Sequence, residues 1–346
     1  MTTRYDHSRA SLTALLDGEP AYRVAQVWDG LYHRLASPTE LTNLPRALRD
    51  RLEHDLPLAL TPVLDRRSAS GDTVKQLWQL GDGHRIESVL MLYPGRATVC
   101  VSTQAGCAMG CGFCATGQAG FERQLEVGEI VEQAVLTARA AADGERRLSN
   151  VVFMGMGEPF ANYENVWAAI VRLHDDVGLS ARHLTVSTVG IVPGIRRLAG
   201  EALPVNLAVS LHAANDALRD ELVPINRRYP LGDLMAACDE YLAARNRRVS
   251  FEWALIDGVN DRPSDAIELA QRCRSLRLPA HVNLIPLNPT PGFGVPGTAP
   301  AAVRGFRDRL TALGVNATVR ANRGIDIDAA CGQLAAGAPV TLRARR

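Results

Sequence analysis

The sequence predicts an α/β protein whose main part is a partial barrel of six strand and helix units, preceded by a small helical domain. Three observations carry this prediction. Short apolar strands alternate with helical stretches from Ala97 onward, the first 75 residues show helical periodicity, and glycine-rich or polar sequences follow the predicted strands. Six such units fit an open barrel better than a closed barrel of eight.

The amino-terminal part, residues 1–75, is predicted to be a helical accessory domain, and residues 76–96 a hairpin that links it to the barrel. Prolines interrupt the helical patterns, and the hairpin is centred on the turn Gly81-Asp-Gly83. The predicted helices are 21–35 and 46–56, and the predicted hairpin strands are 74–80 and 86–93.

Residues 97–300 are predicted to contain the barrel, and residues 301–346 a carboxyl-terminal segment. Apolar residues recur at spacings of three and four in the longer helical stretches. The predicted strands are 98–102, 150–154, 184–188, 205–211, 249–255 and 282–286, with 316–320 as a candidate for one more. The predicted helices between them are 127–142, 163–175, 193–199, 231–244 and 264–275.

Three cysteines follow the first barrel strand in the run Gly106-Cys-Ala-Met-Gly-Cys-Gly-Phe-Cys-Ala-Thr-Gly117. Thiolates are soft ligands that suit iron and sulfide, so Cys107, Cys111 and Cys114 are predicted to bind a four-iron cluster that keeps one iron open for another ligand. A structural zinc site is the alternative, but such a site closes with four ligands and no second cysteine pair lies nearby.

The composition suits a cytosolic enzyme. The 346 residues are 47% hydrophobic, which is enough for a large core, and seven cysteines are not the even set of a secreted disulfide framework. We expect neither export nor membrane insertion, since the chain shows no charged leader with an apolar stretch and no run of about 18 apolar residues. The net charge of +1 gives no general attraction to nucleic acid, so RNA binding would depend on local arginine clusters.

Five segments together resemble the RlmN/Cfr family of dual-specificity RNA methyltransferases, a branch of the radical S-adenosylmethionine superfamily. Their order and spacing match over about residues 20–336. The segments are Gln104-Ala-Gly-Cys-Ala-Met-Gly-Cys-Gly-Phe-Cys-Ala-Thr-Gly-Gln-Ala-Gly120, Phe153-Met-Gly-Met-Gly-Glu-Pro159, Ser210-Leu-His-Ala213, Val223-Pro-Ile-Asn226 and Asp326-Ile-Asp-Ala-Ala-Cys-Gly-Gln-Leu334. The resemblance also implies a partial six-unit barrel and an accessory domain that binds RNA.

The resemblance assigns a [4Fe-4S] cluster to the three motif cysteines and two molecules of S-adenosylmethionine to each turnover. The residues implied to form the S-adenosylmethionine pocket are Gly157, Glu158, Ser187, Ser210, Leu211, His212 and Asn288. A carboxylate and backbone carbonyls accept hydrogen bonds from an ammonium group, which gives Gly157 and Glu158 chemical sense. Taken alone, a Ser or Asn at a strand end more commonly caps a helix or turn.

Three further positions match catalytic residues of the family. Cys331 corresponds to the cysteine that carries the methyl group, Cys100 to the resolving cysteine that forms a transient disulfide with it, and Glu87 to the proton acceptor. In this family a methyl group carried on the cysteine is converted to a radical that adds to the adenine ring. This route has a chemical reason, because C2 and C8 of adenine are electron-poor carbons to which a carbon radical can add. Cys238 and Cys273 lie on apolar helix faces and are predicted to pack in the core.

The predicted function is methylation of C2 of an adenine in 23S rRNA (adenine 2503), with adenine 37 of tRNA open as a second substrate. The resemblance also implies an electron donor such as flavodoxin, a monomer and a cytoplasmic location. Three alternatives stay open: C8 methylation of the same adenine, a radical enzyme that acts on a small molecule, and a non-catalytic RNA-binding protein with a structural metal. Arg320 and Arg323 are candidates for contacts with RNA phosphate, although the family often has an acidic residue where Ile325 stands.

Overall fold

The computed structural model describes residues 2–290 and 292–335, and over these ranges ten strands form one mixed sheet in the order β1-β2-β3-β4-β7-β8-β9-β10-β11-β12. Each pair of neighbours from β4 to β12 runs parallel, as expected for a barrel built from strand and helix units. These strands are β4 (Arg96–Cys100), β7 (Arg147–Phe153), β8 (Leu184–Thr188), β9 (Asn206–Ser210), β10 (Val249–Leu255), β11 (His281–Pro286) and β12 (Asn316–Val319). The predicted α/β partial barrel is confirmed, and its candidate last strand is real.

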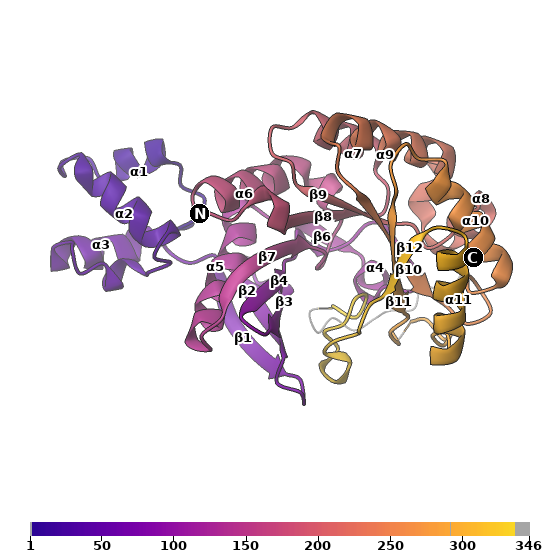
Figure 1. Ribbon diagram of the computed structural model, residues 1–346. Helices are drawn as coiled ribbons and strands as arrows, with labels where there is room; N and C mark the ends of the chain where they lie inside the picture. Colours follow the sequence, from indigo (N-terminus) through magenta and orange to yellow (C-terminus); the bar gives the residue numbers. More distant parts are fainter. Residues whose placement is uncertain (1, 291, 336–346) are drawn as a thin grey trace.

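Helices cover the outer face of the parallel strands, and the inner face is turned toward the segment that follows β12 (Figure 1). The longer ones agree with their predicted ranges to within one or two residues. They are α5 (Val127–Asp143), α6 (Tyr163–Asp175), α7 (Val192–Gly200), α9 (Leu231–Arg245) and α10 (Pro263–Arg274), and those not predicted are α4 (Ala115–Ala119), α8 (Asp216–Leu222) and α11 (Pro300–Ala312). Because β12 follows α11 and belongs to the same sheet, the barrel extends past residue 300. Residues 336–346 of the predicted carboxyl-terminal segment lie outside the described residues.

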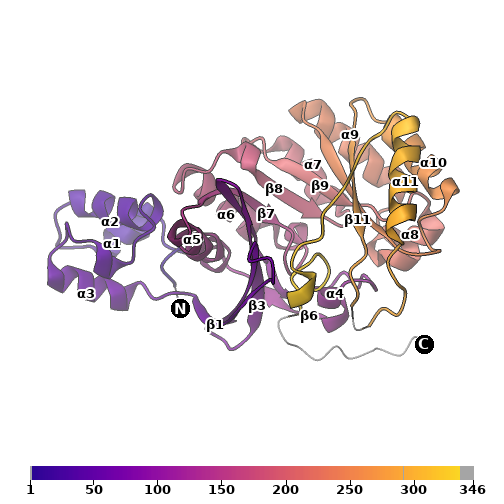
Figure 2. The same cartoon turned by 60° about the horizontal axis from the view of Figure 1, so that its bottom comes forward.

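Three amino-terminal helices pack at the end of the molecule beside α5 and α6 (Figures 1 and 2). They are α1 (Arg9–Leu15), α2 (Tyr22–Tyr32) and α3 (Arg46–Asp55). The Trp28 indole donates to Asp176 at 2.9 Å just after α6, and Arg139 of α5 forms a bidentate pair with Glu40. These contacts fix the helical part against the barrel. Among the described residues, no helix combines the length and the apolar character that crossing a bilayer requires.

The predicted linking hairpin is part of a larger antiparallel arm. Its strands β2 (Thr73–Leu80) and β3 (Arg85–Tyr93) are joined by β1 (Leu60–Arg67), which lies inside the range predicted to be helical, and β3 pairs directly with β4. Residues 61–67 are exposed, Pro62 lies beside an irregular pairing, and the segment ends in charged residues. An exposed edge strand lacks the apolar alternation that sequence patterns detect, which explains why this strand was missed.

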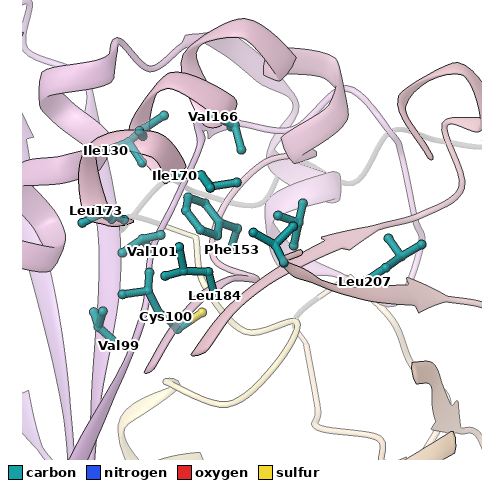
Figure 3. Packing of buried hydrophobic residues seen from close by; sticks show 14 of the residues in the cluster. Val99, Cys100, Val101, Ile130, Phe153, Val166, Ile170, Leu173, Leu184 and Leu207 are labelled. Atoms are coloured by element: carbon teal, nitrogen blue, oxygen red, sulfur yellow. The ribbon is translucent and has the colours of Figure 1, made fainter. Parts of the chain in front are cut away.

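The two faces of the barrel strands differ in polarity. On β10, Phe251 and Trp253 are fully buried on the helix side, while Ser250 and Glu252 alternate with them on the inner side. The same separation holds at β4, where the sulfur of Cys100 points away from the side on which Ile130 and other apolar residues pack (Figure 3). The inner face is therefore free to carry polar chemistry.

Five short 3-10 helices complete the described structure. They are Pro38–Glu40, Pro159–Asn162, Ala181–His183, Pro224–Arg227 and Ile325–Ile327. A separate two-stranded sheet, β5 (Gln104–Gly106) with β6 (Phe121–Gln124), closes the base of the cysteine loop. This small sheet was not predicted, because strands of three and four residues give no usable periodicity.

Candidate active site

A cavity of about 410 Å³ lies among the loops that follow the parallel strands, on the inner side of the sheet. Its size is in the range typical of small-molecule and cofactor sites. The predicted site residues that line it are Cys100, Cys107, Cys111, Cys114, Gly157, Glu158, Ser187, Ser210, His212, Asn288 and Cys331. Two predicted residues, Leu211 and Glu87, are not part of its wall. The cavity wall as a whole contains residues of seven strands, β3, β4, β7, β8, β9, β10 and β11, together with the segment around Cys331.

The cysteine loop is a tight structure held by backbone bonds. The Cys107 amide donates to the Gly120 carbonyl at 2.7 Å, and the Cys114 amide donates to the Cys111 carbonyl at 3.2 Å just before α4 begins. Gly106 has a positive φ of 72°, and a Cβ atom there would come within 2.0 Å of the Gly120 carbonyl oxygen. Only glycine can take this position without moving the loop.

The thiols of this loop sit in surroundings that suit metal-bound thiolates. Burial raises the pKa of Cys107 to about 12 and raises the pKa of Cys111 well above its ordinary value. A free thiolate is costly there, whereas bound iron removes the proton outright and neutralises the sulfur. Among the described residues, no three His, Cys, Asp or Glu side chains are arranged around a single ion. A cubane cluster spreads its three ligands over three irons, so the donor set and the cavity fit a [4Fe-4S] cluster.

Gly157 and Glu158 form the wall at the end of β7. Gly157 has a φ of 101°, and a Cβ atom there would come within 2.6 Å of the Gln104 side chain. The buried Glu158 carboxylate accepts hydrogen bonds from the amides of Phe160 at 3.0 Å and Val189 at 2.8 Å. Burial raises the pKa of Glu158 to about 7, while these bonds oppose the rise. The carboxylate therefore ties the loop after β7 to the end of β8 at the cavity wall.

His212 supplies a defined hydrogen-bond donor to the same cavity. The Ala254 amide donates to its Nδ1 at 2.9 Å, so the ring proton is on Nε2. Burial, together with the charge of Arg219, lowers the pKa of His212 to about 3 and keeps the ring neutral. Its φ of 58° is in the left-handed region, a conformation that non-glycine residues adopt at some cost and often at functional sites.

The serines and Leu211 take different positions around His212. Ser187 of β8 and Ser210 of β9 are half-buried and line the cavity at their strand ends. Leu211 is fully buried, and its amide donates to the Glu252 carbonyl at 3.0 Å. Its side chain packs in the core, so of Leu211 only the backbone is near the site.

Arg219 is a supporting residue that sequence reasoning missed. It is fully buried, and its guanidinium donates to the carbonyls of Leu211 at 3.0 Å and Val189 at 2.7 Å. Asn226, in the Val223-Pro-Ile-Asn226 motif, accepts a further bond from it at 2.8 Å. The arginine thus fixes the ends of β8 and β9 behind the cavity, which gives this motif a structural role. Nothing in the sequence indicated this burial, because an arginine in a short helix such as α8 is usually exposed to solvent.

The segment that carries Cys331 is bound to the cysteine loop. The Ala115 amide donates to the Gly332 carbonyl at 2.8 Å, and the Thr116 hydroxyl donates to the Leu334 carbonyl at 2.5 Å. The Asn288 amide group donates to the Cys331 carbonyl at 3.0 Å. Figure 2 shows this yellow segment beside α4. Contacts between residues more than 200 positions apart in the sequence therefore place Cys331 beside the cysteine loop.

Glu87 supports the same segment from the opposite side. Its carboxylate pairs with Lys75 at 3.1 Å and accepts a hydrogen bond from the Ala335 amide at 3.0 Å. The Lys75 ammonium also donates to the Asp328 carbonyl at 3.3 Å. Both side chains are nearly buried, with exposures of 10% for Lys75 and 5% for Glu87. The structure thus places Glu87 behind the Cys331 segment instead of in the cavity wall.

Cys100 and Cys331 share the cavity with the guanidinium of Arg320. Cys100 is buried, and burial raises its pKa to about 12, with a further rise from Cys331 and an opposing effect of Arg320. Cys331 is exposed to the cavity, but surrounding protein raises its pKa too, and Arg320 again opposes this. A side chain in the wall of a deep cavity is both accessible and poorly solvated. Cys331 therefore lies close enough to Cys100 to contribute to the raised pKa of that thiol.

The two predicted RNA-contacting arginines differ in their surroundings. Arg323 pairs with Asp72 at 2.9 Å, donates to the Leu92 carbonyl at 3.1 Å and stacks on Tyr93. Arg320 projects into the cavity wall, so neither side chain is a free surface cation. Cys238 and Cys273 are buried outside the cavity, as predicted for packing residues.

The chain is similar to radical SAM proteins in both sequence and structure. The sequence profile of the Radical SAM superfamily matches residues 101–270. A crystal structure of a radical SAM methyltransferase from Sphaerobacter thermophilus superposes with a TM-score of 0.93 at 50% identity, and covers 97% of this chain and all of that one.

Curated relatives match almost the whole chain. A probable dual-specificity RNA methyltransferase RlmN from Parafrankia sp. (strain EAN1pec) is 55% identical, over 99% of this chain and 92% of the relative. Another of the same name, from Chloroflexus aurantiacus, is 53% identical over 96% of this chain and 92% of the relative. At this identity and coverage, and with the site just described, the chain belongs to the RlmN family of radical SAM dual-specificity RNA methyltransferases.

Proposed function

We propose that this protein methylates C2 of an adenine in 23S rRNA, adenine 2503, and that adenine 37 of tRNA is a second substrate. The observation that carries the proposal is the meeting of five thiols at one cavity, three from the cysteine loop and two from Cys100 and Cys331. A radical enzyme that acts on a small molecule needs the first three only. The pair of extra thiols supports a reaction in which the substrate is joined to the protein for a time.

The residues present would hold both cofactors. Cys107, Cys111 and Cys114 would bind a [4Fe-4S] cluster, and the wall formed by Gly157, Glu158, Ser187, Ser210, His212 and Asn288 would surround S-adenosylmethionine, with Leu211 contributing its backbone. When bound, the cluster and two molecules of S-adenosylmethionine per turnover supply a methyl group and a carbon-centred radical. The neutral His212 would donate a hydrogen bond from Nε2, and the apolar surroundings of Phe113 would exclude water.

Cys331 and Cys100 would divide the work on the substrate. Cys331 takes up the methyl group as a thioether, and the carbon of that methyl group then forms a bond to the adenine ring. The thiolate of Cys100 attacks the Cys331 sulfur, and the bond between that sulfur and the carbon attached to adenine breaks. The electron pair of this bond stays on the carbon, which takes up a proton to become the methyl group, and a disulfide remains. Burial raises the pKa of Cys100 to about 12 and so opposes formation of the required thiolate. The nearby Arg320 guanidinium acts in the other direction and would favour the thiolate.

Glu87 is the proposed acceptor of the adenine ring proton. Its carboxylate is bonded to Lys75 and to the Ala335 amide, so taking up a proton requires it to weaken at least one of these contacts. We expect the Cys331 segment to shift when RNA enters. A cytoplasmic monomer with a reductant such as flavodoxin completes the proposal.

A deletion strain tests the function directly. Digested rRNA and tRNA should lose 2-methyladenosine when analysed by mass spectrometry, and return of the gene should restore it. Loss of 8-methyladenosine instead would assign the other adenine carbon, and unchanged levels of both would refute the proposal. Anaerobically reconstituted protein should also absorb light at roughly 400 nm, as iron–sulfur clusters with thiolate ligands do.

A further inference from the structure

The inner face of the last three strands carries a row of polar side chains that the proposed function does not use. Glu252 is only 6% exposed, yet it belongs to the cavity wall together with Cys331. The strand register places His281 beside Ser250 and Asn283 beside Glu252. Buried carboxylates are rare in strands unless they are paired or have a function.

These side chains form a continuous hydrogen-bonded chain from the cavity to the surface. The Ser250 hydroxyl donates to Glu252 Oε1 at 3.0 Å and lies 3.2 Å from His281 Nδ1. His281 Nε2 is 2.9 Å from the Thr318 hydroxyl, and Thr318 is exposed on the edge strand β12. Asn283 holds the second oxygen of Glu252 at 2.7 Å. Each link is a group that can both give and take a proton, or an imidazole that passes one between its nitrogens.

The proposed reaction creates a proton that must leave the cavity. When the Cys331 thiol becomes a thioether, its sulfur forms a bond to the methyl carbon, and the bond from that carbon to the sulfonium sulfur breaks. The sulfonium loses its positive charge, the S–H bond of Cys331 breaks, and one proton is left over. No oxidant or reductant takes part in this step.

We propose that Glu252 accepts this proton from Cys331 and that Ser250 and His281 conduct it to solvent at Thr318. The inference rests on the proposed function. As Ser250 Oγ takes the proton of Glu252, it passes its own to His281 Nδ1, and His281 releases a proton from Nε2. The carboxylate is then restored for the next turnover.

The charged groups around the path suit this role. Burial raises the pKa of Glu252, with Arg320, just after β12, opposing the rise. Burial, and secondarily Arg248, lowers the pKa of His281, so its ring is neutral near pH 7 and able to accept. The Cys331 and Cys100 thiols and the Tyr93 hydroxyl are the remaining titratable groups of the cavity near Arg320.

A rate measurement on Glu252→Gln separates a proton path from a simple charge effect. The Glu252 carboxylate raises the pKa of Cys331, so its loss by charge alone would favour the thiolate and speed methylation. Loss of the proton acceptor would instead slow it, by roughly tenfold to a hundredfold. The full-length reconstituted protein is mixed with S-adenosylmethionine without reductant, and methylated Cys331 is followed by peptide mass spectrometry.

Two further variants test the conducting links. We expect Ser250→Ala and His281→Gln to slow methylation of Cys331 as well, with a larger solvent deuterium effect in the wild-type protein than in either variant. The matched control is Glu201→Gln, because Glu201 also accepts a hydroxyl bond, from Tyr163 at 3.1 Å, but lies outside the cavity wall. That variant should methylate Cys331 at the wild-type rate.

Alkylation of Cys331 by iodoacetamide, without S-adenosylmethionine, gives a second readout that also reports folding. In Glu252→Gln the pH at which the alkylation rate of Cys331 is half its maximum should be lower than in the wild-type protein, while methylation of Cys331 slows. Methylation as fast as or faster than wild type would overturn the proposal, and so would wild-type rates in both Ser250→Ala and His281→Gln. Absence of methylated Cys331 in the wild-type protein would refute the proposed function instead, because that result does not depend on Glu252.

Discussion

Replacing Lys75 by methionine tests how the Cys331 segment is held in place. The change keeps most of the side-chain volume but removes a cation whose side chain is 10% exposed and whose partner, Glu87, is 5% exposed. A buried ion pair that loses one member leaves an uncompensated charge, which costs about 3 to 5 kcal/mol. We therefore expect Lys75→Met to lower the free energy of unfolding by about this amount.

The expected thermal shift follows from the length of the chain. With 346 residues and about 2 cal/mol/K per residue, the unfolding entropy is about 0.7 kcal/mol/K. The melting temperature should then fall by about 4 to 7 °C in differential scanning calorimetry. Because Lys75 also binds the Asp328 carbonyl, amide hydrogen exchange of residues 328–335 should become faster than in the wild-type protein.

A double-mutant cycle checks the reasoning. Lys75→Met combined with Glu87→Met should cost clearly less than the sum of the single changes, since neither charge is then left alone. Arg46→Met is the control, because Arg46 and Asp50 form a surface pair at 3.8 Å with exposures of 89% and 65%, worth at most about 1 kcal/mol. If Lys75→Met costs no more than this control, the pair does not hold the segment.

Three further predictions concern the active site and the core. Cys100→Ala should trap a covalent adduct between Cys331 and RNA, seen as a protein–RNA band in denaturing gels; recovery of free protein with methylated Cys331 after turnover would contradict the resolving role. Gly106→Ala should destabilise the cysteine loop by about 1 to 3 kcal/mol and reduce cluster absorption, because the added methyl group meets the Gly120 carbonyl. Burial raises the pKa of Glu132 to about 7, so the folded protein keeps a proton that the unfolded chain loses near pH 4.5, and the free energy of unfolding should fall by about 1 to 3 kcal/mol as the pH rises through this window. Glu132→Gln should flatten that part of the pH profile in urea titrations, and an unchanged slope would be evidence against the assignment.

The barrel was predictable because its signals are local. A buried parallel strand is a short apolar run and its helix has a repeat of three and four, so β8 and α6 matched their predicted ranges closely. The exposed edge strand β1 and the short strands β5 and β6 carry no such repeat and were missed. The predicted hairpin was correct, but its continuation into β4 depends on a pairing that no local pattern contains.

The sequence by itself was enough to predict the cluster ligands, because Cys107, Cys111 and Cys114 lie within eight residues and their spacing alone limits what they can bind. It also marked Cys331 and Cys100 through the resemblance to the RlmN/Cfr family. Only the tertiary structure decided which groups surround them. Contacts such as Lys75 to Asp328, and the chain from Glu252 to His281, join residues far apart in the sequence. The chain from Glu252 to His281 exists because neighbouring strands align side chains on one face of a sheet, and that alignment is fixed by strand order and register. The Lys75 contact exists because the segment after β12 returns across β2.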